Sequence, residues 1–180
     1  VELTDRLLEA TMKTLINQAP LVLQNPNDYD AWAELMWSGT IAHNNLLDTG
    51  RLGDWASHDI EHELSGIYDI AHGAGLAVVF PAWMKYTYQH DRNRFVQWAV
   101  RVWNVEMNVY NQDTVVIQGI ERMETFFRYI GLGTRLSELG IKEDRFEEMS
   151  VKCTYGNKRK VGNFVKLDSA DILKILKLAA

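Results

Sequence analysis

The sequence is poor in several features that mark particular classes of protein. It has one cysteine, Cys153, in 180 residues, which excludes an internal disulfide and a cysteine-rich zinc site and fits a reducing compartment. No apolar run approaches the roughly 20 residues of a membrane span, and the N-terminal residues lack the basic and apolar regions of a signal peptide. The sequence therefore predicts a soluble, cytoplasmic chain.

Positive charge is also scarce. Lysine and arginine number 19 against 24 aspartate and glutamate residues, so the net charge is −5, and the one dense basic cluster is Lys158-Arg159-Lys160. This distribution excludes a nucleic-acid-binding surface. Apolar side chains are abundant instead, at 47% of the residues. That fraction and length fit one domain with a sizeable core, and most of the six tryptophans are expected in the core or in a pocket wall.

Apolar residues recur at helical spacing through most of the chain. The pattern predicts a helix that begins after Asp54 and others over residues 3–19, 29–47, 76–88, 91–104, 114–130 and from about Ser169 onward. Pro20 is expected to stop the first of them and Pro81 to interrupt or kink the helix over 76–88. No alternating strand pattern flanks a hairpin turn. The fold class predicted is all-α, a multi-helix domain over residues 1–180.

Three of the five histidines lie between Asp54 and Pro81. On a helix, His58 and His62 share one face with about 6 Å of rise between them, so both imidazoles can reach one metal or one substrate. His72 would lie about 21 Å from His58 along a continuous helix, too far to share a metal whose nitrogen ligands lie at roughly 2.0–2.1 Å. A shared metal therefore requires the chain to turn back before His72, and the glycines in this stretch favour such a turn.

The run His58-Asp59-Ile60-Glu61-His62 admits other interpretations. It is similar to the H-E-x-x-H pattern of zinc proteases with aspartate in second place, but the metzincin extension fails at Ser65 and Tyr68. The dipeptide His58-Asp59 is similar to the HD-type phosphohydrolases, which are all-α and metal-dependent. That function remains one alternative. A non-enzymatic helical module with structural histidines is another.

A longer stretch resembles a known family. It runs G-D-W-A-S-H from Gly53, H-E-L from His62 and Y-D-I-A-H-G-A-G-L-A from Tyr68, and it ends at Pro81-Ala82. One histidine, a second four residues later, a third ten beyond that, and a small-residue run leading to Pro-Ala resemble the iron-containing alcohol dehydrogenases. The branch most similar is that of the NAD(P)H-dependent butanol dehydrogenases. The resemblance implies the helical C-terminal domain of that family, which is dehydroquinate-synthase-like.

The resemblance also implies roles for the histidines. His58 and His72 are expected to be metal ligands, and His62 to handle a proton near the substrate. The family's other two ligands and its Rossmann-like cofactor domain are expected upstream of these residues, so no cofactor-binding residue is assigned and the 180 residues alone should be inactive. Apolar side chains such as Trp55, Phe80 and Trp83 would suit an alkyl chain.

The same resemblance implies cofactors and partners. The expected cofactors are a divalent metal, Fe²⁺ or Zn²⁺, and NAD(H) or NADP(H) in the full-length enzyme. The expected substrate is a short-chain alcohol or aldehyde such as butanol, and the oligomer considered is a homodimer. No nucleic acid or membrane is expected as a partner.

Overall fold

The computed structural model describes residues 1–180, and its regular secondary structure is almost entirely helical. Its eight α-helices are α1 (Glu2–Gln24), α2 (Tyr29–His43), α3 (Ala56–Tyr68), α4 (His72–Thr87), α5 (Arg92–Arg101), α6 (Gln112–Tyr129), α7 (Phe146–Cys153) and α8 (Ser169–Ala179). The only β contact is an isolated antiparallel bridge between Val161 and Leu167. The all-α prediction is confirmed. None of the helices combines the length and the apolar content that crossing a bilayer requires.

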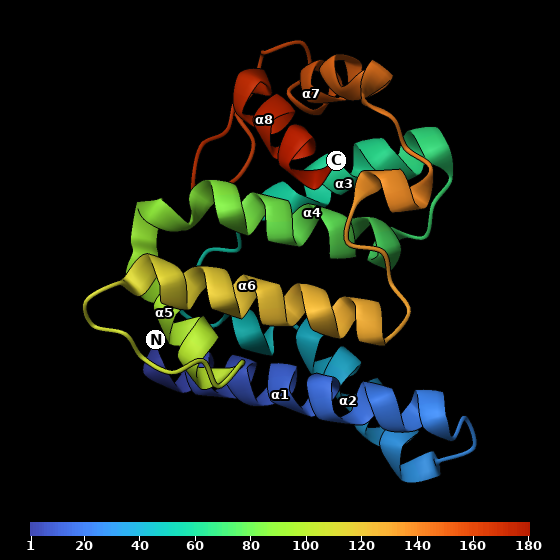
Figure 1. The fold of residues 1–180 in the computed structure, drawn as a ribbon, viewed down its shortest axis with the longest axis vertical. Helices are drawn as coiled ribbons and strands as arrows, with labels where there is room; N and C mark the ends of the chain where they lie inside the picture. Colours follow the sequence, from blue (N-terminus) through green and yellow to red (C-terminus); the bar gives the residue numbers. More distant parts are fainter.

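Helix α4 lies at the centre of the molecule. In Figure 1, α1 and α2 form one end, α5 and α6 lie between that end and α4, and α3, α7 and α8 form the other end. Val78 and Val79 of α4 belong to a buried cluster shared with α3, α7 and α8, and Met84 belongs to a second cluster shared with α5 and α6. Because α4 is apolar on nearly every side, it can be buried between both clusters.

Pro20 does not stop its helix, contrary to the sequence prediction, and Pro81 does not interrupt its own. Pro20 lies inside α1, which continues to Gln24, and Pro81 lies inside α4, which continues to Thr87. Each proline removes one helical hydrogen bond. The helices persist because packing outweighs this loss: Pro81 is itself buried, and α1 lies along α2. Neither proline stops its helix.

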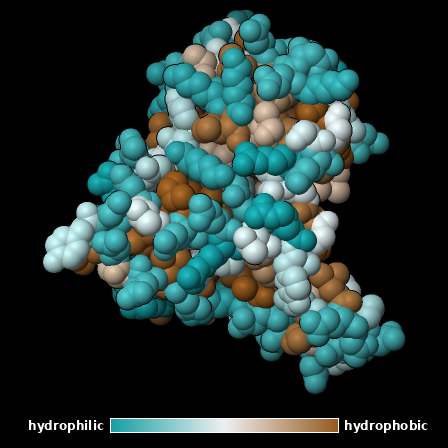
Figure 2. Space-filling model, viewed as in Figure 1, coloured by the Kyte–Doolittle hydropathy of each residue, from teal (hydrophilic) through white to brown (hydrophobic).

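Helix α2 exposes much of its apolar surface. Of its residues only Ala31 and Ser38 are buried, whereas Trp32, Met36 and Trp37 are exposed. The surface in Figure 2 is largely hydrophilic, with apolar patches concentrated in the middle of the molecule. Trp55 is also exposed, so the expectation that most tryptophans lie in the core or in a pocket wall is wrong for three of the six.

The close approach of α5 and α6 depends on Gly119. A Cβ atom added there would lie 2.6 Å from Ala99 Cβ. We therefore expect Gly119→Ala to lower the free energy of unfolding, measured by urea denaturation, by about 1–3 kcal/mol through overpacking. A Cβ atom added at Gly66 in α3 would have no neighbour within 4 Å. Gly66→Ala should therefore raise the free energy of unfolding by about 0.5–1 kcal/mol. Equal stability of the two variants would contradict this account.

Candidate metal centre

The turn between α3 and α4 brings the three histidines of the Asp54–Pro81 stretch together. Helix α3 ends at Tyr68, where Asp69 takes a left-handed conformation (φ 52°) and its N–H donates to Ser65 O at 3.0 Å. Helix α4 then begins at His72. The His72 ring lies 5.4 Å from the His58 ring and 5.2 Å from the His62 ring, centroid to centroid. The predicted reversal of the chain is confirmed.

The turn itself is built differently from the sequence expectation. The break between the two helices, residues 69–71, contains no glycine. Asp69 takes the left-handed conformation there, which aspartate adopts less often than glycine. Gly73 and Gly75 instead lie within α4. Gly75 is needed for space, because a side chain there would overlap the carboxyl group of Glu61 on α3.

The surroundings of His58 favour a neutral imidazole. Its ring packs edge-on against Trp55 at 4.9 Å and against Phe80 at 6.0 Å. Burial lowers the pKa of His58, and the neighbouring His72 and His62 rings lower it further. A metal ligand must offer a lone pair, so a histidine that resists protonation suits that role.

The donor set of this turn fits a divalent metal. Candidate ligand atoms of Glu61, His62 and His72 all lie within 4.8 Å of one another. His58 is not one of these three residues, but its ring lies 5.4 Å from the His72 ring, centroid to centroid. Imidazole and carboxylate donors suit both iron and zinc. The sequence prediction named the three histidines and overlooked Glu61, whose proximity to His72 depends on the turn.

Asp59 lies outside this group. Its carboxylate is 3.6 Å from Arg159 Nη2. The HD-type and zinc-protease interpretations both need Asp59 beside the histidines. Its pairing with Arg159 therefore counts against both.

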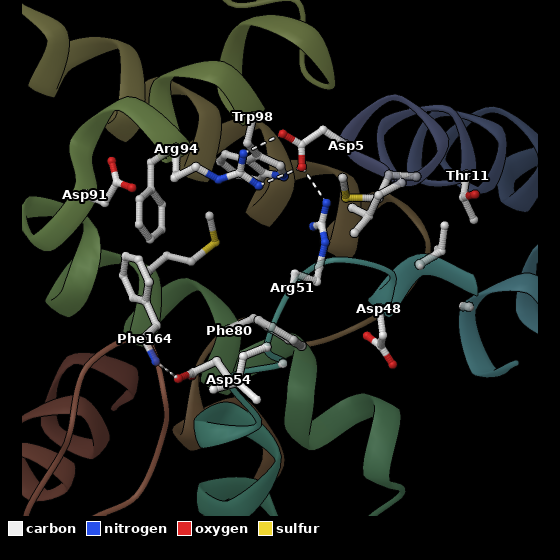
Figure 3. A pocket seen from close by; sticks show the side chains of 18 of the residues that line it. Asp5, Thr11, Asp48, Arg51, Asp54, Phe80, Asp91, Arg94, Trp98 and Phe164 are labelled. Carbon is white, nitrogen blue, oxygen red and sulfur yellow. Dashed lines mark hydrogen bonds and ion pairs between the residues drawn. The ribbon is translucent and has the colours of Figure 1, made fainter. Parts of the chain in front are cut away.

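A pocket of about 850 Å³ opens beside His58. Figure 3 shows Phe80 and Phe164 on one side of it and Asp5, Arg51 and Arg94 on another. The volume lies within the range of small-molecule sites. Of the apolar residues expected to suit an alkyl chain, Phe80 and Trp83 line this pocket, whereas Trp55 does not.

One charged side of the pocket is an ion-pair cluster around Asp5. Asp5 accepts hydrogen bonds from Arg94 Nη1 at 2.6 Å and from Arg51 Nη2 at 2.5 Å, which joins α1 to α5 and to the loop before α3 (Figure 3). The hydrogen bond from Arg94 holds the pKa of Asp5 well below its usual range, although burial acts in the opposite direction. These ion pairs join α1 to its neighbours, while Arg51 Nε is buried without a hydrogen-bond partner.

Asp54 joins the start of α3 to a loop near the C-terminus. Its Oδ1 accepts from the backbone N–H groups of Asn163 and Phe164, both at 2.6 Å, and its Oδ2 accepts from Ala56 N–H at 3.2 Å. Trp55 takes the N-cap position of α3, without a side-chain hydrogen bond to the helix. The Asp54 side chain thus also holds Phe164 in the pocket wall, against Phe95. No local pattern marks this contact, since about 110 residues separate its partners.

Comparison with known proteins agrees with this arrangement. Residues 1–180 match the model of the Fe-containing alcohol dehydrogenase family, C-terminal. The chain is 38% identical over 180 residues to NADH-dependent butanol dehydrogenase B of Clostridium acetobutylicum, covering 97% of this chain and 45% of that protein. It is 34% identical over 140 residues to the NADPH-dependent aldehyde reductase YqhD of Escherichia coli, covering 78% of this chain and 36% of that protein.

Solved structures agree with the sequence comparison. The NADH-dependent butanol dehydrogenase A of Thermotoga maritima has a TM-score of 0.93 to this chain at 35% identity, covering 99% of this chain and 46% of that one. The chain thus spans about half the length of the relatives it matches. The resemblance seen in the histidine stretch is confirmed over the whole chain, which belongs to the Fe-containing alcohol dehydrogenase family and represents its C-terminal region.

Proposed function

We propose that residues 1–180 form the metal- and substrate-binding domain of an NAD(P)-dependent alcohol dehydrogenase or aldehyde reductase that acts on short-chain alcohols such as butanol. The observation that carries the proposal is the convergence of His58, His62 and His72 at the α3–α4 turn, beside a largely apolar pocket. The butanol dehydrogenases and the aldehyde reductase among its relatives support the substrate class.

We assign the binding of NAD(H) or NADP(H) to a Rossmann-like domain outside these 180 residues. Such a domain binds the dinucleotide where a strand meets a helix through a glycine-rich loop, and the structure here has no strand that meets a helix in this way. The 180 residues alone are therefore expected to show no dehydrogenase activity. A homodimer is the assembly proposed for the whole enzyme.

We assign His58 and His72 as ligands of Fe²⁺ or Zn²⁺. When bound, the metal supplies Lewis-acid polarisation of the substrate oxygen, and the nicotinamide supplies the hydride chemistry. Phe80 and Trp83 bind the alkyl chain and exclude water from it. His62 is exposed, so its imidazole can take the hydroxyl proton and pass it to solvent.

The test of this function is an activity assay on a chimera. The N-terminal half of the Thermotoga maritima butanol dehydrogenase A is joined ahead of Val1, and oxidation of NADH or NADPH is followed with butyraldehyde after loading with iron or with zinc. We expect metal-dependent turnover by the chimera and none by residues 1–180. A chimera that is folded by circular dichroism but inactive with both metals would refute the dehydrogenase function and favour the non-enzymatic module. Release of phosphate from nucleotides by residues 1–180 with a divalent metal would instead favour the phosphohydrolase.

The role of His62 has its own test. His62→Asn in the chimera should lower kcat by about 10²-fold, the lower part of the range for general acid–base catalysis, because solvent can partly replace an exposed proton carrier. The matched control is His43→Asn, since His43 is likewise exposed and bonds only to Gly39 O within its own helix. Equal kcat values for the two variants would show that His62 does not transfer the proton.

A further inference from the structure

Glu61 is the most deeply buried acidic residue of the chain. Four acidic side chains are buried: Asp5, Glu9, Glu61 and Glu124. Asp5 and Glu9 pair with arginine and Glu124 pairs with lysine. Glu61 has 0% exposed surface, and its only basic partner is His72. A buried carboxyl group is costly unless it is hydrogen-bonded, so the pairing with His72 is what compensates the burial of Glu61.

The contacts of Glu61 are all made at the α3–α4 interface. Its Oε2 contacts Nδ1 of His72 and lies 3.5 Å from Ser65 Oγ. Its Oε1 has no hydrogen-bond partner and faces Gly75, where a side chain would overlap the carboxyl group. Helix α4 therefore provides both the partner of the carboxyl group, His72, and the space that it occupies, at Gly75.

We propose that Glu61 is a positioning residue that orients His72 as a metal ligand. Its Oε2 accepts the N–H of His72 Nδ1, which fixes the tautomer and leaves the lone pair on Nε2 for a metal. A carboxylate behind a histidine ligand does this in many metal proteins, where it also restrains the ring and raises its basicity. The inference rests on the proposed role of His72 as a ligand.

A direct ligand role for Glu61 fits the contacts less well. Oε2 and His72 Nδ1 touch each other, so no ion fits between these two atoms. A carboxylate ligand would need both atoms to separate, whereas a positioning carboxylate needs the contact that is present. The tautomer of His72 distinguishes the two roles, because only the positioning role requires the proton on Nδ1.

The experiment reads that tautomer in the metal-free chain. Two-bond ¹H–¹⁵N correlation spectra, recorded at alkaline pH where histidine rings are neutral, show which ring nitrogen carries the proton, and the signals are assigned with a His72→Gln variant. We expect the Nδ1–H form in the wild-type chain, loss of that preference in Glu61→Met, and its partial recovery in Glu61→Gln, whose amide oxygen still accepts. An Nε2–H form in the wild-type chain would overturn the proposal whether or not the variants fold.

Zinc binding provides the second readout. Titration of the chain with Zn²⁺ should give a dissociation constant about 10–100-fold weaker for Glu61→Met, the usual effect of losing an outer-shell partner. Glu63→Met is the matched control, because Glu63 lies on the same helix and pairs with Lys152 instead of a histidine. It should change neither the tautomer nor the affinity. Unchanged zinc affinity in Glu61→Met would overturn the proposal.

The two readouts also separate this inference from the proposed function. A wild-type chain with the Nδ1–H form that binds no Zn²⁺ would count against the metal site while supporting the Glu61–His72 coupling. A chain that binds Zn²⁺ through His58 and His72, with the same tautomer in wild type and Glu61→Met, would support the metal site and remove Glu61 from it.

Discussion

Replacing both His58 and His72 with alanine is expected to lower the metal-dependent turnover of the chimera by about 10³-fold. Polarisation of a substrate oxygen by a metal is worth several kcal/mol of transition-state stabilisation, and each 1.4 kcal/mol is tenfold in rate. His58 is half-buried in the first turn of α3 and His72 is exposed at the start of α4. Because His72→Ala also removes the partner of the buried Glu61 carboxyl group, circular dichroism is used first to establish that the double variant is folded. The measurement is kcat/KM for butyraldehyde, together with the metal content of the purified protein.

The control for this experiment is His43→Ala. His43 is exposed at the end of α2 and lies outside the converging group, so its loss should leave metal content and kcat/KM unchanged. Full activity in the double variant would refute the assignment of both ligands. Loss of activity with full metal content would instead mean that other residues bind the metal.

The second large effect is expected in the core. Phe146, at the start of α7, is 1% exposed and belongs to the cluster shared by α3, α4, α7 and α8. Phe146→Ala should lower the free energy of unfolding by about 3–5 kcal/mol, since it removes a buried ring and leaves a cavity. Urea denaturation followed by circular dichroism measures the change.

Val151→Ala on the same helix is the matched control for Phe146→Ala. Val151 is 42% exposed, so its truncation should change the free energy of unfolding by no more than about 0.5 kcal/mol. A loss below about 1 kcal/mol for Phe146→Ala would mean that α7 contributes little to the core.

Much of the fold follows from local patterns in the sequence. Helical spacing of apolar residues predicted five of the eight helices by their residue range and two more by their start. Helix α7 was not predicted, because eight residues between loops give too short a pattern. The prediction that Pro20 stops the first helix was wrong, and Pro81 does not interrupt α4, because local rules omit the packing that holds both helices together.

Some features of the candidate metal centre could also be predicted from the sequence, and others could not. The sequence alone determined that His58 and His62 share a helix face and that a metal shared with His72 requires a turn, because both follow from helix geometry. Only the tertiary structure decided that Asp69 makes the turn, that Glu61 is buried behind His72, and that Asp54 holds Phe164 in the pocket wall. Spacing along a helix is a property of neighbouring residues, whereas burial and the meeting of distant segments depend on how all the helices pack.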